Sequence, residues 1–393
     1  MPTMTMKCEK EHRILRGIAR QSMNRDDAAL LEENVRTGVQ WPFIMFRAIE
    51  EGIAPLLYHH FKNLNLLETI PEYALEVFAR LYAETMLLNR HMATVLSELE
   101  GALEGSEIQV IVLKGAALFT TVYHDIALRP MEDIDLMVRP EHQDGVEAIL
   151  RERGFVSDPL YPMTFRRGVM TVDLHNDFLS AHRIRSRREV MRVPSRDIWA
   201  RSVPAAEGAH HVFRLSLYDN LIALSSHLLK HRFYRLIWFV DIRESIEADS
   251  ELFDWTEFVE HVGNIRAKKA VLYALLLAKC LLTMDVPDYV LDGLGKGGLS
   301  AIEKYILRLR LADAPPGTVT DVLWVLQISG WVKRLQFTME NIFPRREVMN
   351  QIFPDSSHRV PVFLKRAAAA LSQVASDGAS AFRTVVKGGL PPL

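Results

Sequence analysis

The sequence predicts an α+β protein in which a small mixed β-sheet core lies between N-terminal helices and a large helical C-terminal lobe. Three observations predict this fold class. Apolar residues follow helical spacing near the N-terminus, short β-rich apolar runs occupy the middle of the chain, and helical spacing then returns. The expected domains are residues 1–104 (helical region), 105–205 (α/β core) and 206–393 (helical lobe).

Composition narrows the classes of protein. Of the 393 residues, 49% are hydrophobic and 24% are charged, which excludes a disordered chain. The 47 Lys and Arg against 49 Asp and Glu provide no basic field for a nucleic-acid template. Cys8 and Cys280 cannot form a disulfide framework or a zinc site, which favours a reducing cytoplasm.

Neither a signal peptide nor a membrane span is expected. Charged residues interrupt the first ten positions, whereas a signal peptide has an apolar core. The longest apolar run, Val271–Met284, contains Lys279 and is shorter than the roughly 18–20 residues that cross a bilayer. The expected location is the cytoplasm.

The first elements are helices. Apolar residues recur at helical spacing after Asp26, and the stretch from Pro71 to Glu100 has no internal glycine or proline. The core then alternates strands and helices, with Pro140 and Gly154 as stop signals and Gly168 as a turn. Its expected elements are strand Ile108–Leu113, helix Ala116–Tyr123, strand Asp133–Val138, helix Glu141–Arg153, and strands Met163–Arg166 and Val169–Asp177.

Helical patterning returns after Ser216. Asp254 stands as the N-cap of one of these helices, and the tail from Ser376 is rich in Ala, Ser and Gly and is expected to be loose. The expected helices are 216–232, 236–248, 254–263, 267–283, 299–312 and 320–340.

The strongest chemical signal is Asp133-Ile134-Asp135. Alternate residues of a strand share a face, so the two carboxylates point the same way. Like charges held close together repel one another unless a cation compensates, and a hard ion such as Mg²⁺ takes oxygen ligands. An acidic pair at a turn or strand edge is the alternative.

A third acid follows on a later strand. In Thr171-Val172-Asp173-Leu174-His175, Asp173 and His175 share one face and the aliphatic residues share the other. If this strand lies beside the first acidic one, Asp173 completes a cluster of three carboxylates. Asp177 has the same parity and is the competing candidate, and an edge salt bridge is the alternative for Asp173.

Upstream, Lys114-Gly115-Ala116 joins a strand to a helix through a glycine. The free N–H groups of a helix N-terminus favour a phosphate, and Lys114 would add a point charge. Such junctions are common, so this motif alone is a weak signal.

These motifs together resemble a known family. The run LKGAALFTTVYHDIALRPMEDIDLMV, the helix ending in RGF and the strand TVDLHNDF look like the uncharacterised branch of the DNA polymerase β-like nucleotidyltransferase superfamily. The resemblance covers residues 108–178 well and continues more loosely through SHLLKH and FVDIRE near 225–245. Familiar members have Gly-Ser at the first junction, where this chain has Gly115-Ala116, and a shorter gap to the acids.

The resemblance implies a reaction and its residues. Asp133, Asp135 and Asp173 would hold Mg²⁺, with Mn²⁺ as a substitute, and Asp173 would act as general base. Lys114, Gly115, Ala116 and Arg129 would bind a nucleoside triphosphate, with ATP as the first choice. Arg129 would either neutralise phosphate or brace its loop. The acceptor would be a hydroxyl of a small molecule, sugar, peptide or protein.

Residues outside these motifs are weaker candidates. His227 and His231 lie four apart on one helix face and would contact the acceptor or a metal, although buried structural histidines are the commoner case. Asp241 would orient one of them, and His175, on the same face as Asp173, would contact the acceptor or support the residues that hold the metal. The arginines of 183–192 would meet an anion or form a solvated loop: Arg183, Arg185, Arg187, Arg188 and Arg192.

Two rival functions use the same residues. An inactive family member would bind a nucleotide or a partner protein without catalysing a reaction. A metal-dependent phosphoesterase would use the same carboxylates with water as the nucleophile. The retained acids argue against the first, because a site that only binds has no need of clustered like charges.

Overall fold

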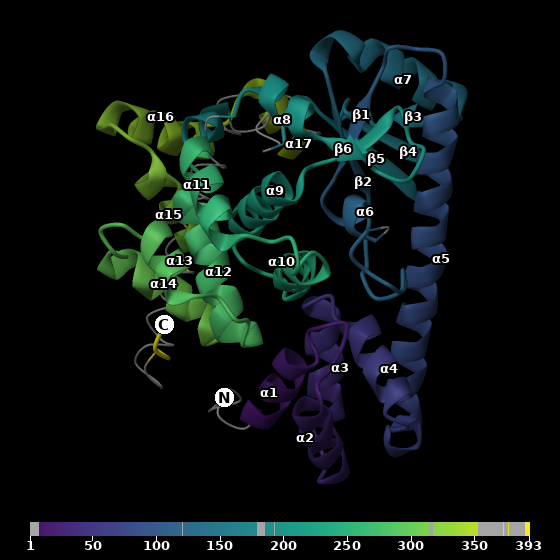
Figure 1. Ribbon diagram of the computed structural model, residues 1–393, viewed down its shortest axis with the longest axis vertical. Coiled ribbons are helices and arrows are strands. Elements are labelled where there is room, and N and C mark those ends of the chain that lie inside the picture. The colour runs from purple at the N-terminus through teal and green to yellow at the C-terminus, as the bar shows by residue number, and fades with distance from the viewer. Residues whose placement is uncertain are drawn as a thin grey trace.

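The structure is a computed structural model that describes residues 8–119, 121–178, 185–191, 193–313, 317–352, 372, 376 and 390–393. Its elements confirm the predicted fold class: one seven-stranded mixed sheet among many helices (Figure 1). In the described part of the chain, no helix has the length and apolar character to cross a membrane.

The sheet has the order β3-β4-β5-β2-β1-β7-β6. β2 pairs in parallel with β5 and antiparallel with β1, which itself pairs in parallel with β7. The predicted core strands all form, but the pairing of β7 with β1 also places residues beyond 205 in the sheet. The strands are β1 Val110–Leu113, β2 Ile134–Val138, β3 Val156–Ser157, β4 Thr164–Arg167, β5 Met170–His175, β6 Val203–Pro204 and β7 Val212–Arg214.

One face of the sheet is covered by α5 (Glu72–Leu103) and α7 (Gln143–Glu152). Figure 1 shows α5 running the length of the sheet and continuing down to α4. Ile134, Leu136 and Val172 point into this core, together with Val95 and Leu99 of α5. Because side chains alternate along a strand, the neighbouring acids point to the other face.

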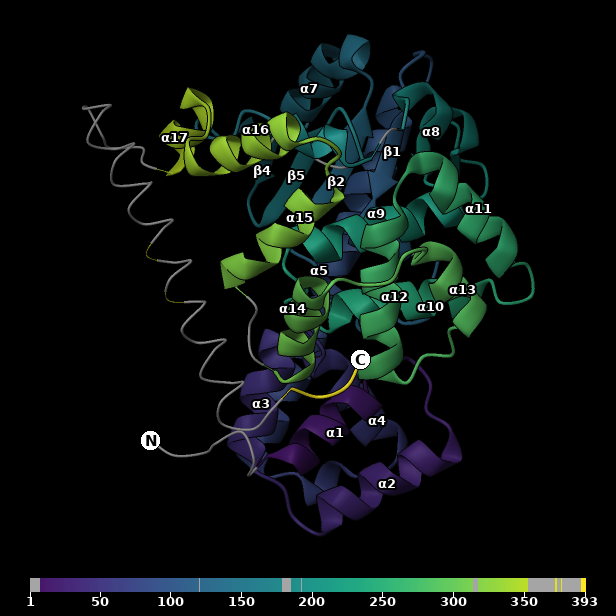
Figure 2. The same cartoon turned by 90° about the vertical axis from the view of Figure 1, so that its left-hand side faces the viewer.

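The other face meets a larger core shared by the N-terminal helices and the C-terminal lobe. From the side, the helices α9, α10 and α12 lie between the sheet and α1 (Figure 2). The helices that build this region are α1 Glu9–Gly17, α2 Arg25–Arg36, α3 Trp41–Glu50, α4 Ala54–Asn63, α8 Ser195–Arg201, α9 Leu217–Lys230, α10 Ile237–Ala248, α11 Trp255–Ile265, α12 Lys268–Leu282, α13 Asp288–Leu294, α14 Ala301–Leu311, α15 Asp321–Gln327, α16 Trp331–Ile342 and α17 Arg346–Ile352.

Two helix predictions need correction. The segment 320–340 forms two helices, α15 and α16, because Gly330 between them has a φ of 90°, outside the helical region. The helix expected over Ala116–Tyr123 is only α6 (Lys114–Leu118). The loose tail expected from Ser376 falls mostly outside the described residues.

A buried ion-pair network fixes the loop between α9 and α10. Glu51, directly after α3, accepts hydrogen bonds from Leu236 N at 2.7 Å and from Arg310 Nη2 at 2.8 Å. Arg310, on α14, also donates from Nε to Phe233 O at 2.7 Å. Phe233 has a φ of 56°, a conformation that non-glycine residues adopt only when their surroundings hold them there.

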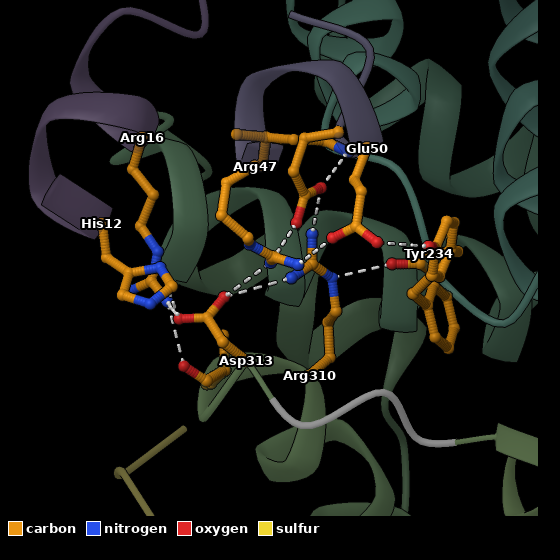
Figure 3. A network of polar contacts seen from close by, with 11 residues as sticks. His12, Arg16, Arg47, Glu50, Tyr234, Arg310 and Asp313 are labelled. Atoms are coloured by element: carbon orange, nitrogen blue, oxygen red, sulfur yellow. Dashed lines mark hydrogen bonds and ion pairs between the residues drawn. The ribbon is translucent and has the colours of Figure 1, made fainter. Parts of the chain in front are cut away.

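The same network reaches α1 and the end of α14 (Figure 3). Asp313 accepts from Arg16 Nη2 at 2.8 Å and lies 3.1 Å from His12 Nδ1. At its other end, Tyr234 donates its hydroxyl to Glu50 Oε1 at 3.3 Å. The N-terminal helices therefore share both a core and a charged network with the lobe.

Candidate active site

Three aspartates converge at the centre of the sheet. Asp133 immediately precedes β2, Asp135 lies within it, and Asp173 is paired with Asp135 in the parallel register of β2 and β5. One carboxylate oxygen from each lies within 4.8 Å of the others. Asp177 is not part of this group and lines a different cavity. The geometry therefore brings Asp173 to the pair.

The pKa values of the Asp133 and Asp135 carboxyls are shifted in opposite directions. Burial raises the pKa of Asp133 to about 7, and the negative charge of Asp135 adds to the rise. Burial alone would also raise the pKa of Asp135, but Lys114 and His175 outweigh it and hold that pKa well below its ordinary value. Asp135 is thus charged at neutral pH, whereas burial and the charge of Asp135 oppose the ionisation of Asp133 more strongly than Lys114 and Arg129 favour it.

Lys114 contacts a carboxylate directly. Its Nζ lies 2.6 Å from Asp135 Oδ1, and His175 Nε2 lies 2.6 Å from the same oxygen. Register explains the first contact, since Leu113 of β1 is paired with Asp135. Lys114 itself has a φ of 52°. His175, expected to support the residues that hold the metal, contacts one of them, Asp135.

Packing accounts for the glycine of the junction. A Cβ at Gly115 would lie 2.8 Å from Arg129 Nη1 and from Met131 Sδ, so a side chain here would displace both. Ala116 points into the core behind the sheet. Because α6 has only five residues, it offers little of the helix dipole that the sequence led us to expect.

Arg129 braces its loop in this structure. Its Nε and Nη2 donate to the two carboxylate oxygens of Asp241 at 3.2 and 2.7 Å, and Nη1 donates to Pro130 O at 2.7 Å. Asp241 also accepts from the Tyr123 hydroxyl at 2.7 Å. In the part of the chain that the structure describes, Asp241 therefore bonds to Arg129 and Tyr123 rather than to either histidine, so a role in orienting a histidine stays a prediction.

The three aspartates open onto a cavity of about 590 Å³ between the sheet and the helical lobe. Lys114, Gly115 and Arg129 lie on the same wall as the acids, and Tyr161 and Thr164 close one side. The opposite wall comes from α9, α10 and the loop between them, and consists of His227, Lys230, His231, Tyr234, Arg235 and Trp238.

The two histidines of that wall form an aromatic cluster. The rings of His227 and His231 are 4.4 Å apart between centroids, and Trp238 lies 4.8 Å from the first and 5.1 Å from the second. Burial lowers the pKa of His231 to about 3 and that of His227 well below its ordinary value, with Lys230 and Lys114 respectively as the next causes. Both imidazoles are neutral at pH 7.

Sequence reasoning missed several residues of the cavity. Thr164 donates its hydroxyl to Asp173 Oδ1 at 2.5 Å, and Tyr234 and Trp238 belong to the facing wall. Thr164 lies opposite Asp173 in the β4–β5 register, so the predicted hairpin around Gly168 contained the signal for it. Tyr234 and Trp238 carry no such signal, because a contact between distant segments places them.

The arginine run contributes little to the described site. Arg183 and Arg192 lie outside the described residues, and only the backbones of Arg185 and Arg188 are described. The guanidinium of Arg187 lies 5.1 Å from the centre of the Trp324 ring, on the helical lobe. Binding of an anion by this run stays a prediction.

Three carboxylates on neighbouring strands, facing a polar cavity, form a group that could hold a divalent metal ion. Comparison with known families agrees: residues 37–283 match the family described as uncharacterised nucleotidyltransferase. The chain belongs to this family, which confirms the resemblance seen in the motifs. No curated protein and no solved structure matches the chain.

Proposed function

We propose that this chain is a metal-dependent nucleotidyltransferase of the DNA polymerase β-like type. It would move a nucleoside monophosphate from a nucleoside triphosphate, ATP as the first choice, to a hydroxyl acceptor and release pyrophosphate. The observation that carries the proposal is the group of three aspartates, whose oxygens lie within 4.8 Å of one another at the floor of a cavity of about 590 Å³.

The donor set suits Mg²⁺ or Mn²⁺. All three candidate ligands are carboxylates, the oxygen donors that these hard ions prefer. The raised pKa of Asp133 is a second argument, because it marks an excess of negative charge that a divalent ion would relieve. When bound, such ions polarise the phosphate oxygens and offset the charge on the leaving pyrophosphate.

The chain's own residues would divide the remaining work. Asp133 and Asp135 would hold the metal against the triphosphate. Asp173 would accept the proton of the acceptor hydroxyl, whose oxygen bonds to the α-phosphorus as the bond to the β-phosphate oxygen breaks. The hydroxyl of Thr164 already donates to Asp173 Oδ1 and would fix which carboxylate oxygen faces the acceptor.

The acceptor molecule and the nucleobase of the triphosphate would share the remaining space of the cavity. His227, His231 and Trp238 present neutral aromatic groups there, and Lys230 and Arg235 add positive charge. The balanced net charge of −2 supports an acceptor other than a nucleic-acid template. A cytoplasmic location remains part of this proposal.

The test is nucleotide binding and pyrophosphate release with each of the four common nucleoside triphosphates, with Mg²⁺ or Mn²⁺ and with EDTA. The wild type is compared with Asp133→Asn/Asp135→Asn. Metal-dependent, saturable binding that the double variant loses is the expected result. Binding unaffected by both metal and variant would overturn the proposal and favour an interaction module. Nucleotide hydrolysis without an acceptor would favour a phosphoesterase.

A further inference from the structure

Lys114 combines two features that the proposed reaction does not explain. It is a long cationic side chain at the floor of the nucleotide cavity, and it is bound to one of the carboxylates that would hold the metal. Both side chains of this pair are largely buried, with exposed fractions of 12% for Lys114 and 8% for Asp135.

The pair uses up one carboxylate oxygen. Asp135 Oδ1 receives Lys114 Nζ at 2.6 Å and His175 Nε2 at 2.6 Å, which accounts for both lone pairs of that oxygen. A divalent ion that binds Asp135 must displace the ammonium from Oδ1 or bind Oδ2 beside it, against its positive charge. Both routes weaken the binding of the ion.

Two other cations of the cavity, the guanidinium groups of Arg129 and Arg235, pair with carboxylates outside the group of three aspartates. Arg129 pairs with Asp241 at 2.7 Å, and Arg235 lies 3.4 Å from Glu132 at the rim. Among the ion pairs in the part of the chain that the structure describes, Lys114 is the Lys or Arg side chain that reaches the three aspartates.

We infer that Lys114 is an internal competitor of the divalent ion, which makes metal and nucleotide bind together. A metal ion alone has to overcome the ammonium. A triphosphate that arrives with the metal offers phosphate oxygens. Because the side chain of Lys114 is flexible, its ammonium group can leave Asp135 and bind these oxygens instead. The nucleotide therefore raises the affinity for the metal, and the metal raises the affinity for the nucleotide by the same factor, since coupling between two ligands is reciprocal. This inference rests on the proposed function, because it takes the aspartates as metal ligands.

The test compares Lys114→Met with the wild type in two binding assays. The first titrates the protein with Mn²⁺ alone and follows free Mn²⁺ by electron paramagnetic resonance. The second measures binding of a non-hydrolysable ATP analogue at saturating Mg²⁺. Removing the competing charge should tighten Mn²⁺ binding about tenfold or more, while the analogue binds about tenfold more weakly because the phosphates lose a partner. Lys296→Met, at an exposed lysine that does not line the cavity, is the matched control and should leave Mn²⁺ binding within about twofold.

Opposite changes in the two assays distinguish the inference from a structural role. If Lys114 merely supports the fold, replacing it should weaken the binding of both ligands. That result, or an unchanged affinity for Mn²⁺, overturns the inference. Lys114→Gln keeps a hydrogen-bond donor without the charge and should show the same pattern if Lys114→Met does not fold. If Asp133→Asn binds Mn²⁺ as tightly as the wild type does, the assignment of the aspartates as metal ligands fails instead.

Discussion

The charge on Asp133 should destabilise the fold when no metal is bound. Its pKa is about 7 in the folded protein against an ordinary value of 3.8, a difference of about 3 units. At about 1.36 kcal/mol per unit, ionisation costs the folded state up to about 4 kcal/mol. Because Asp133 is only partly buried, solvent screening reduces this figure, and we expect Asp133→Asn to stabilise the protein by about 1–3 kcal/mol near pH 8.

The sign of the effect fixes its pH dependence. The folded protein holds a proton on Asp133 more tightly than the unfolded chain does, so the cost is complete above pH 7 and disappears below the ordinary pKa. The difference between variant and wild type should therefore shrink steadily as the pH falls from about 8 to about 4.

Urea denaturation in EDTA across that pH range measures the difference. Asp292→Asn, an exposed aspartate on α13, is the control and should change stability little at any pH. Added Mg²⁺ should offset most or all of the variant's advantage, since the wild type gains binding free energy, about 2.7 kcal/mol at 100 times the dissociation constant. A variant that is no more stable near pH 8, or a gain that does not depend on pH, would refute the electrostatic reasoning.

Three further predictions concern the groups around the aspartates. Arg129→Met leaves Asp241 buried with an uncompensated charge and should cost about 3–5 kcal/mol in urea denaturation, whereas Arg129→Met/Asp241→Leu should recover much of the loss. Gly115→Ala places a Cβ 2.8 Å from Arg129 and Met131, so the melting temperature should fall by an amount equivalent to about 1–3 kcal/mol, and an unchanged value would mean that both neighbours yield freely. Arg310→Met releases the loop that carries Tyr234 and should weaken nucleotide binding more than Mn²⁺ binding, as isothermal titration would detect; equal losses would indicate general unfolding.

The strands and the acid cluster follow closely from the sequence. Alternation of Asp133, Asp135 and Asp173 with aliphatic neighbours sets their common face, and this local property survives folding. The facing wall could not be predicted. His227 and His231 were recognised as a helical pair, but their placement across from the aspartates depends on how α9 packs against the sheet, which local spacing does not encode.

The contact between Arg129 and Asp241 is a second feature of the site that could not be predicted from the sequence. Each was recognised as a candidate, 112 residues apart, yet their pairing with one another was not. A buried guanidinium requires an anionic partner, and the sequence left open whether Arg129 would neutralise a substrate phosphate or brace its loop. Only the tertiary packing of α10 beside the first strand–helix junction decides between these two.

The N-terminal helices take part in the site through the wall that they hold. The loop bearing Tyr234 and Arg235 contains a left-handed non-glycine residue, Phe233, and such a backbone is stable only where surrounding contacts fix it. Glu51 from the N-terminal helices and Arg310 from α14 supply those contacts. A chain reduced to the sheet and its covering helices would keep the three aspartates but lose the bonds that hold the opposite wall in place. The structural unit that forms both walls of the cavity therefore extends from the N-terminal helices to α14.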